Sequence, residues 1–374
     1  MNIYDQLGVK KYVNALATVT AYGGSIMPPE VLAAMTEASR SFVNIMELQK
    51  KAGDCIAKLT NNEAAMISCG AASGMVLAAA VAIAGDDADA RMKLPQSDGL
   101  KNEILVSRKN RVGYDSAIKS GGGVIVEYGG DEAATEAELE AAITDKTAAI
   151  FAFYFEELER FMKGQIPIAA QVKIARRHGI PLIVDAAAQI PVRENLWKFT
   201  RDWGADVAIF SGGKGLRGPQ ASGLVVGKRE YIDRMVSYAC PNGGVGRPMK
   251  VGKEEIIGLM TAVRLYVESD EAATIARYER EVQSVIGAFA GDPAVTACRD
   301  FPSEAGQLMP RAKITPRSLK AEPAKIAEWL REAEPGVLVA TDAVSLLINP
   351  QTMELGELEI VIEQLRKAFD AFRE

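Results

Sequence analysis

Histidine is almost absent from this 374-residue sequence, and cysteine is rare. The single histidine, His178, precedes Gly179, a pattern that indicates a helix end, where a cationic side chain suits the helix dipole. A Ser-His-Asp triad and a histidine-based metal site are therefore nearly excluded. The four cysteines are scattered without a CxxC pair, so we expect neither disulfides nor a bound metal: Cys55, Cys69, Cys240 and Cys298.

The chain also lacks an excess of positive charge and a long apolar segment. Its 43 Lys and Arg and 49 Asp and Glu give a formal net charge of −6, which argues against nucleic acid as a partner. The most apolar stretch, 64–84, is mostly alanine with serine and glycine inside it, so a buried strand, turn and helix is a better interpretation than a membrane span. No basic region followed by an apolar run opens the sequence, so we expect a cytoplasmic protein.

Short apolar runs alternate with helical patterns over the first two thirds of the chain, which predicts a mostly parallel sheet with helical crossovers. The runs are 64–68, 103–107, 123–127, 147–154, 181–185, 206–211 and 223–226. One helix is predicted to open at Pro28-Pro29 and run through Ser39, one long helix to span 253–280, and a final helix to span 355–372. We expect an N-terminal segment (1–48), a large α/β domain (49–250) and a smaller α+β domain (251–374).

Ligands of open parallel sheets bind beyond the carboxyl ends of the strands, so the residues after the apolar runs are the first site candidates. One such segment, Ser68-Cys69-Gly70-Ala71-Ala72, leads from a strand into an alanine-rich helix. Small side chains let backbone N–H groups approach an anion such as a phosphate monoester. Tight packing of a small-residue helix is an equally good interpretation of this segment alone. It is neither a Walker A loop nor GxGxxG.

A second strand end carries Asp185, which is followed by Ala186, Ala187 and Ala188. A buried carboxylate needs a cationic or hydrogen-bonding partner, and a pyridinium nitrogen is one such partner. Ala187 is small enough to let a flat ring lie against the backbone. The alternatives are an aspartate that caps the next helix and a magnesium ligand of a nucleotide hydrolase, and the missing Walker A loop weakens the latter.

A third strand end leads into Ser211-Gly212-Gly213-Lys214-Gly215. A lysine in a glycine-lined turn can reach a central ligand, and burial would lower its pKa as a Schiff-base lysine requires. A solvated loop lysine is the alternative. Because one helix and one strand separate Asp185 from Lys214, we expect the two on neighbouring strand ends. Carboxylate, amine and helix N-terminus are together the three anchors that pyridoxal 5'-phosphate (PLP) needs.

At these residues the sequence resembles the selenocysteine-synthase-like family of PLP-dependent enzymes, and within it the D-glucosaminate-6-phosphate ammonia-lyase type. The likeness covers nearly the whole chain and is most specific at 184–189, 211–220 and 246–255, with further similarity at 13–15 and 20–24. It implies the aspartate aminotransferase fold (fold type I) and a homodimer, or a larger assembly of dimers, with the active site at the subunit interface. The implied cofactor contacts include Lys214, Asp185, Ala187, Gln189, Ser211 and Gly213.

Two positions depart from the family pattern. Asn110 lies shortly before Tyr114-Asp115, where related proteins tend to have a histidine that stacks on PLP. We therefore expect Asn110 beside the cofactor, with stacking supplied by another residue such as Tyr114 or missing. Ala17 lies where glycine is expected. Selenium transfer to a charged tRNA is not expected, because that activity needs a large basic platform, usually an extra N-terminal domain, and this acidic chain begins close to its first motif.

The resemblance implies a lyase that removes water and ammonia from an amino acid with a β-hydroxyl group, such as D-glucosaminate 6-phosphate, and yields a 2-keto acid. Lys214 is the expected base and Asp185 the partner of the ring nitrogen. Arg247 is the first candidate for substrate binding, with Arg111, Arg108 and Tyr22 as further ones, although an ion pair or a solvated position explains each arginine equally well. The alternatives are other PLP chemistry (carbon–sulfur lyase, aldolase or racemase) and a non-catalytic PLP-binding protein. A desulfurase would need a nucleophilic cysteine, for which Cys240 is the one candidate in a suitable place, although a buried spacer is the better interpretation of this residue.

Overall fold

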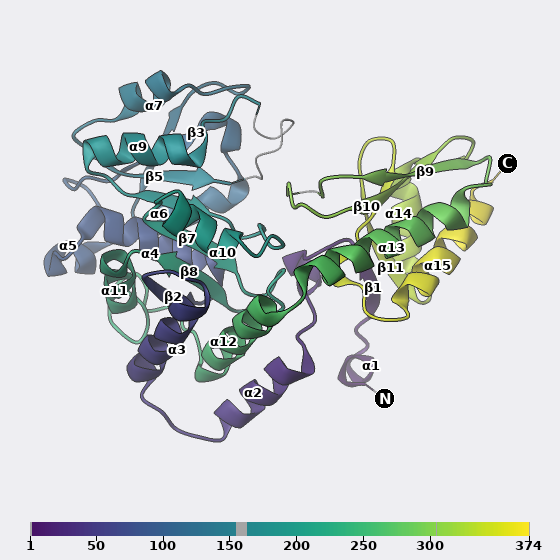
Figure 1. The fold of residues 1–374 in the computed structure, drawn as a ribbon, viewed down its shortest axis with the longest axis horizontal. Helices are drawn as coiled ribbons and strands as arrows, with labels where there is room; N and C mark the ends of the chain where they lie inside the picture. The colour runs from purple at the N-terminus through teal and green to yellow at the C-terminus, as the bar shows by residue number, and fades with distance from the viewer. Residues whose placement is uncertain (1, 155–162, 304, 374) are drawn as a thin grey trace. The chain divides into compact units, whose positions relative to one another are not determined.

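The computed structural model describes residues 2–154, 163–303 and 305–373. The chain forms two compact units, a larger one of Ile26–Ser269 and a smaller one in which Met1–Ser25 join Asp270–Glu374. Both chain termini belong to the smaller unit (Figure 1). The expected domain limits after residues 48 and 250 stay predictions, because compactness does not measure independent folding.

The larger unit contains a seven-stranded sheet with the order β2-β8-β7-β6-β5-β3-β4. Every predicted apolar run forms one of its strands, with small shifts at the ends. β8 is antiparallel to both of its neighbours and the other pairings are parallel, which confirms a mostly parallel sheet. The strands are β2 (Ala64–Ser68), β3 (Glu103–Ser107), β4 (Val124–Tyr128), β5 (Thr147–Phe153), β6 (Leu182–Asp185), β7 (Val207–Ser211) and β8 (Gly223–Gly227).

The two faces of this sheet bury separate hydrophobic clusters. Along β3, Leu105 belongs to one cluster, whereas Ile104 and Val106 belong to the other. This division follows from strand geometry, because successive side chains point to opposite faces. The alanine-rich helix α4 (Gly70–Ala84) packs against β5, β6, β7 and β8, and most of its residues are buried. The stretch 64–84 is therefore a buried strand, turn and helix, as predicted.

The remaining helices of the larger unit connect or cover the strands (Figure 1). α9 ends at His178, and Gly179 adopts a left-handed conformation with φ +65°, so the predicted helix end is confirmed. Of the helices in the described parts of the chain, none is both long enough and apolar enough to cross a membrane. The bounds are α2 (Pro29–Ser39), α3 (Ile45–Leu59), α5 (Ala88–Lys93), α6 (Ser116–Ser120), α7 (Glu136–Ala142), α9 (Ile168–His178), α10 (Asn195–Trp197), α11 (Arg229–Tyr238) and α12 (Lys253–Glu268), with short turns η2 (Arg108–Asn110), η3 (Gly113–Asp115) and η4 (Lys198–Asp202).

The smaller unit is a five-stranded sheet, β1-β11-β12-β10-β9, covered by helices. The N-terminal strand β1 pairs in parallel with β11, and the other pairings are antiparallel. Helices and strands share a core that includes Phe289, Leu330 and Phe369. The bounds are β1 (Tyr12–Ala15), β9 (Val295–Asp300), β10 (Arg311–Pro316), β11 (Gly336–Thr341), β12 (Leu346–Ile348), α1 (Ile3–Leu7), α13 (Glu271–Phe289), α14 (Pro323–Glu332) and α15 (Glu357–Ala371), with turns η1 (Thr20–Tyr22) and η5 (Pro350–Thr352).

The prediction of one unbroken helix over 253–280 is wrong. α12 ends at Glu268, and α13 begins at Glu271 after a break at Ser269 and Asp270. The Asp270 side chain accepts a hydrogen bond from the Ala273 backbone N–H at 2.9 Å and caps the second helix. Aspartate is a favoured N-cap residue because its carboxylate satisfies an N–H group that has no partner within the helix. The helix break also separates the two compact units.

Candidate active site

Asp185 is the last residue of β6, at the carboxyl edge of the larger sheet. It is in register with Phe153 of β5 on one side and with Ile209 of β7 on the other. The Ala187 backbone N–H donates to Asp185 Oδ1 at 2.9 Å. Burial raises the pKa of Asp185, and the Ala187 N–H and the charge of Lys214 oppose this rise only in part. A carboxylate held in this way favours a cationic partner that enters the site.

Lys214 lies in the turn between β7 and β8, and β7 is the direct neighbour of β6. The side chains of Lys214 and Asp185 therefore come from adjacent strand ends, close enough for each charge to affect the pKa of the other. Burial lowers the pKa of Lys214, and the Asp185 carboxylate partly counteracts this effect. A lowered pKa increases the neutral fraction of the amine, which is the form that attacks a carbonyl or accepts a proton.

Glycines on both sides of Lys214 are required by close packing. A Cβ at Gly213 would lie 2.6 Å from Gln220 Cα, and a Cβ at Gly215 would lie 2.6 Å from the Ile190 carbonyl oxygen. Real Cβ atoms do not approach backbone this closely, so larger residues would displace the turn. The glycine pattern around Lys214 thus has a structural cause as well as leaving the lysine side chain accessible.

The predicted anion-binding segment lies at the same edge of the sheet. Ser68 at the end of β2 and Ser211 at the end of β7 are both in register with Gly223, the first residue of β8. The buried Ser68 hydroxyl donates to the Gly70 carbonyl at 2.9 Å, so this side chain stabilises the turn itself. Cys69 is the N-cap of α4 but makes no side-chain capping hydrogen bond. The first N–H groups of a helix have no acceptor within that helix, so anion binding here would use the backbone at the start of α4, at Gly70, Ala71 and Ala72, which stays a prediction.

The Cys69 thiol is poorly suited to nucleophilic chemistry. Burial raises its pKa, and the nearby carboxylate of Glu255, in the first turn of α12, raises it further. Nucleophilic cysteines need the opposite shift, because the thiolate is the reactive form. The raised pKa therefore argues against a nucleophilic role for the Cys69 side chain.

Asn110 and Gln189 also lie at this edge. The Asn110 side-chain amide donates to Gln165 Oε1 at 3.2 Å and is 3.5 Å from the carbonyl oxygen of Phe153, the residue in register with Asp185. Gln189 is buried, its backbone N–H donates to the Ala186 carbonyl, and its own carbonyl accepts a hydrogen bond from Asn195. Gln189 thereby stabilises the turn after Asp185.

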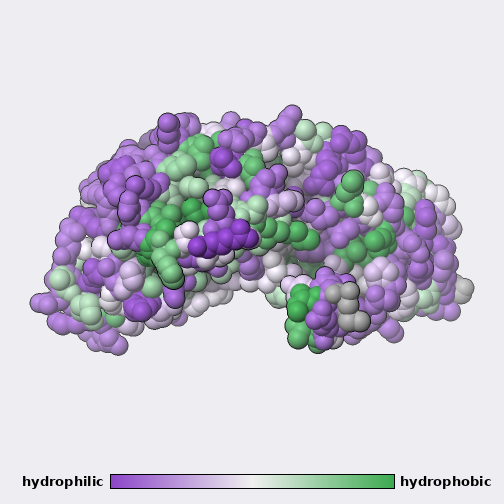
Figure 2. Space-filling model, turned by 90° about the horizontal axis from the view of Figure 1, so that it is seen from below, coloured by the Kyte–Doolittle hydropathy of each residue, from purple (hydrophilic) through white to green (hydrophobic). Residues whose placement is uncertain are grey.

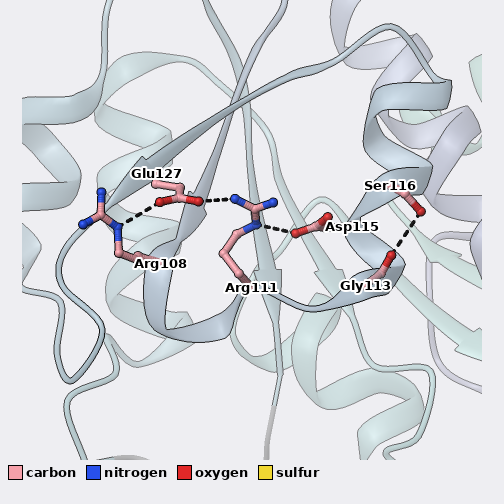
Figure 3. Close-up of polar contacts among 6 residues, drawn as sticks. All are labelled: Arg108, Arg111, Gly113, Asp115, Ser116 and Glu127. Atoms are coloured by element: carbon pink, nitrogen blue, oxygen red, sulfur yellow. Dashed lines mark hydrogen bonds and ion pairs between the residues drawn. The ribbon is translucent and has the colours of Figure 1, made fainter.

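The candidate substrate-binding arginines differ in their surroundings. The Arg111 guanidinium lies between Glu127 of β4 and the buried carboxylate of Asp115, and Arg108 binds the other oxygen of Glu127 at 2.8 Å (Figure 3). Hydrogen bonding to Asp115 is the main reason that the pKa of Arg111 is raised. Both guanidinium groups are therefore held by carboxylates of the protein.

Arg247 is exposed on the loop between α11 and α12, and its Nη1 lies 3.5 Å from Cys240 Sγ. No carboxylate of the described residues forms an ion pair with it. Tyr22 belongs to the smaller unit, where its ring packs edge-to-face on Tyr12 with 5.8 Å between centroids. Ala17, the position where glycine is expected, has a left-handed φ of +92°, which explains the preference for glycine there.

Sequence reasoning missed two residues near the site. They are Glu255, whose charge acts on the Cys69 thiol, and Gln165, which accepts a hydrogen bond from Asn110. Neither carries a local sequence signal, since both reach the site through contacts between segments far apart in the chain.

The arrangement fits a flat, charged heterocycle with a phosphate group. The Asp185 carboxylate suits a protonated ring nitrogen, the Lys214 amine suits a carbonyl carbon, and the start of α4 suits a phosphate. All three lie at the carboxyl edge of one sheet, where open parallel sheets bind their ligands.

Known proteins are similar to this chain in both sequence and fold. The family model for L-seryl-tRNA selenium transferase matches residues 13–278. D-glucosaminate-6-phosphate ammonia lyase from Salmonella typhimurium is 32% identical and is matched over 98% of this chain and 97% of its own length. A 5'-C-glycyluridine monooxygenase-decarboxylase from a Streptomyces species is also 32% identical, over 96% of this chain and 86% of its length.

Solved structures are also similar to this chain in fold. The structure of D-glucosaminate-6-phosphate ammonia-lyase matches with a TM-score of 0.87 and 31% identity, over 100% of this chain and 99% of that one. A ureidoglycine–glyoxylate aminotransferase from Bacillus subtilis matches at 13% identity with a TM-score of 0.61, over 97% of this chain and 94% of that one, which supports the fold alone. The predicted fold type I architecture is confirmed. The chain belongs to the L-seryl-tRNA selenium transferase family of proteins.

Proposed function

We propose that this protein is a PLP-dependent lyase that converts a β-hydroxy amino acid into a 2-keto acid and ammonia, with a phosphorylated sugar amino acid such as D-glucosaminate 6-phosphate as substrate. The observation that carries the proposal is the placement of Asp185 and Lys214 at adjacent strand ends, close enough for each charge to affect the pKa of the other. The ammonia lyase from Salmonella typhimurium, matched over nearly its full length, supports the choice of reaction and substrate.

PLP, when bound, supplies an electron-accepting ring that stabilises negative charge at the substrate Cα. Asp185 would hold the positive charge on the ring nitrogen, and Lys214 would hold the ring through its amine. The N–H groups at the start of α4 would bind the phosphate. Asn110 would contact the site with an amide rather than an aromatic ring, and we assign no stacking residue in its place.

Lys214 is also the proposed base. With PLP bound, Lys214 Nζ would remove the proton from the substrate Cα, and burial favours this role because it lowers the pKa of the amine. The net reaction would remove one water with the β-hydroxyl group and take up one water on release of ammonia, so it exchanges no water overall and needs no oxidant.

Arg247 is our proposed ligand for a substrate anion. It is exposed and has no carboxylate partner among the described residues, whereas Arg111 is already held by Asp115 and Glu127 (Figure 3). A guanidinium that is free of internal ion pairs can bind a carboxylate or phosphate in a bidentate geometry.

Arg247→Ala should raise the KM for the substrate by about tenfold or more while the visible band of bound PLP stays unchanged, because one charge-assisted contact is worth roughly 1.5–3 kcal/mol. Arg111→Ala is the matched control: it should lower the free energy of unfolding by about 1–3 kcal/mol, since it leaves Asp115 buried without its cation. Steady-state kinetics and denaturant unfolding of both variants check this. A raised KM in the Arg111 variant alone would reverse the assignment.

We further propose a homodimer, or an assembly of dimers, as the working form. Large apolar side chains are exposed on the larger unit, among them Leu32, Phe42, Val43 and Tyr114. Figure 2 shows separate hydrophobic areas within a mainly hydrophilic surface. A fully exposed phenylalanine such as Phe42 is the kind of side chain that protein interfaces cover.

The expected cytoplasmic location and the absence of a nucleic-acid partner stay predictions from the sequence.

The proposed reaction is tested by incubating the PLP-loaded protein with D-glucosaminate 6-phosphate and measuring ammonia and 2-keto acid in equal amounts. The unphosphorylated sugar amino acid, serine and cysteine serve as comparison substrates. Release of sulfide from cysteine, or racemisation without ammonia, would instead favour other PLP chemistry.

A further inference from the structure

The turn that carries Lys214 is closed by backbone hydrogen bonds. The Gly218 N–H donates to the Gly212 carbonyl at 2.8 Å, and the Gly212 N–H donates to the Ser222 carbonyl at 2.9 Å. Within this loop the Arg217 N–H donates to the carbonyl of Lys214 itself at 2.9 Å. The position of the lysine therefore depends directly on the conformation of Arg217.

Arg217 adopts an unfavourable backbone conformation. Its φ is +56°, in the left-handed region, and only two other non-glycine residues of the described chain have positive φ, Ala17 and Asn61. For an L-amino acid this conformation costs about 1–2 kcal/mol. Glycine would avoid the cost, and the same loop has glycine at 212, 213, 215 and 218. We therefore expect the arginine side chain to offset this cost through a contact that glycine could not make.

The Arg217 side chain ties the lysine turn to another segment of the larger unit. Its Nε donates to the Ile26 carbonyl oxygen at 2.8 Å. Ile26 immediately precedes the Met27-Pro28 link into α2, and α2 packs against α12. At Gly258 of α12, an added Cβ would lie 2.8 Å from Met35 Cγ of α2 and 2.7 Å from Pro219 Cγ of the lysine loop. α12 thus supports both partners of the Arg217–Ile26 hydrogen bond.

The opposite side of the turn is fixed by direct packing. Gly215 contacts the backbone of Ile190, in the segment that follows Asp185, and Gly213 contacts the backbone of Gln220. The contact with Ile190 limits movement of the turn toward the segment that follows β6. The Arg217–Ile26 hydrogen bond restrains the turn near Arg217. Together they leave Lys214 little freedom to move relative to Asp185.

We propose that Arg217 is a positioning residue for Lys214: its side chain holds the strained turn in the one conformation that directs the lysine amine toward the site opposite Asp185. The inference rests on the proposed role of Lys214. Backbone strain at a functional turn persists where surrounding contacts enforce it, and here the hydrogen bond to Ile26 is that contact.

Three variants of the PLP-loaded protein distinguish a role of Arg217 in positioning Lys214 from a role in stability alone. Arg217→Gly removes the side chain and relieves the strained φ, so its melting temperature should equal or exceed that of an Arg217→Ala variant, which keeps the strain. Both should shift the pH at which the visible PLP band is half converted and lower kcat by about tenfold, since small displacements of a reacting group have effects of this order. Arg217→Lys should partly restore the parent half-conversion pH and kcat, because lysine can still donate to the Ile26 carbonyl.

An Arg217→Gly variant with the parent half-conversion pH and kcat would overturn the inference. So would losses in all three variants that follow their melting temperatures, because a purely structural role would have that signature. Lys214→Ala, measured alongside, separates the two proposals. If it keeps the visible band, the role of Lys214 is wrong and the inference fails with it; if it loses the band while Arg217→Gly is unchanged, the inference alone fails.

Discussion

Lys214→Ala should abolish the visible absorption band that PLP shows when it is linked to a lysine, and should lower kcat by a factor on the order of a thousand or more, because both the linkage and the proton transfer depend on its amine. Free PLP should still enter the site, since Asp185 and the start of α4 are unchanged. The absorption spectrum of the reconstituted variant and mass spectrometry after borohydride reduction, which fixes PLP to its lysine, measure this directly.

Lys51→Ala is a suitable control for that experiment. Lys51 is an exposed lysine of α3 whose ion pair with Glu47 lies on the surface, so its loss should change neither the spectrum nor the rate. Reductive labelling of a peptide other than the one containing Lys214 would show that another lysine carries the cofactor.

Asp185→Asn should have opposite effects on the cofactor-free and the PLP-loaded protein. Burial raises the pKa of Asp185, so its ionisation opposes folding once the pH exceeds its ordinary value of about 4. Near neutral pH the variant without cofactor should therefore melt at a higher temperature than the parent, and this difference should shrink as the pH falls toward 4.

With PLP bound, Asp185→Asn should instead lower the melting temperature. The variant no longer pairs the ring nitrogen with a buried anion, and the loss of one partner of a buried pair costs about 3–5 kcal/mol, or roughly two to four powers of ten in PLP affinity. Melting curves with and without PLP, together with a PLP titration, test both halves. Equal PLP affinity in parent and variant would remove Asp185 from the ring-nitrogen role.

Asp206→Asn is the matched control. Asp206 lies just before β7, at the opposite end of that strand from Lys214, and its carboxylate accepts a hydrogen bond from the Leu182 N–H and pairs with Lys228 at 2.6 Å. Its replacement should lower the melting temperature with and without cofactor and leave PLP affinity nearly unchanged.

The strands of the larger sheet and the adjacency of Asp185 and Lys214 could be predicted from the sequence because both depend on local patterns. Apolar runs mark buried parallel strands, and residues that follow such runs gather at one edge of the sheet. The spacing between the two residues then allows one helix and one further strand, and the helical segment α10–η4 and the strand β7 do lie between Asp185 and Lys214. No long-range information is needed for this step.

Other features depend on contacts that sequence patterns do not contain. The pairing of Arg111 with Glu127 brings together a turn and an edge strand. The pairing of β1 with β11 joins opposite ends of the chain. The break at Ser269–Asp270 interrupts a region whose composition favours helix on both sides, and only the capping hydrogen bond to Ala273 marks where it falls. The strained φ of Arg217 likewise follows from tertiary packing.

The antiparallel strand β8 has a consequence for how this protein is made. In the order of the sheet β2 adjoins β8 alone, so β2 and the turn at Gly70 cannot take their final place until the chain has been synthesised to about Gly227. During translation the alanine-rich segment after β2 is made before the five parallel strands β3 to β7, so its final packing must wait for them, which is the situation in which nascent chains aggregate or engage chaperones. With the proposed roles of the start of α4 and of Lys214, both ends of the site are completed only in this late step, and a ribosome-bound fragment that stops before β8 should be unable to retain PLP.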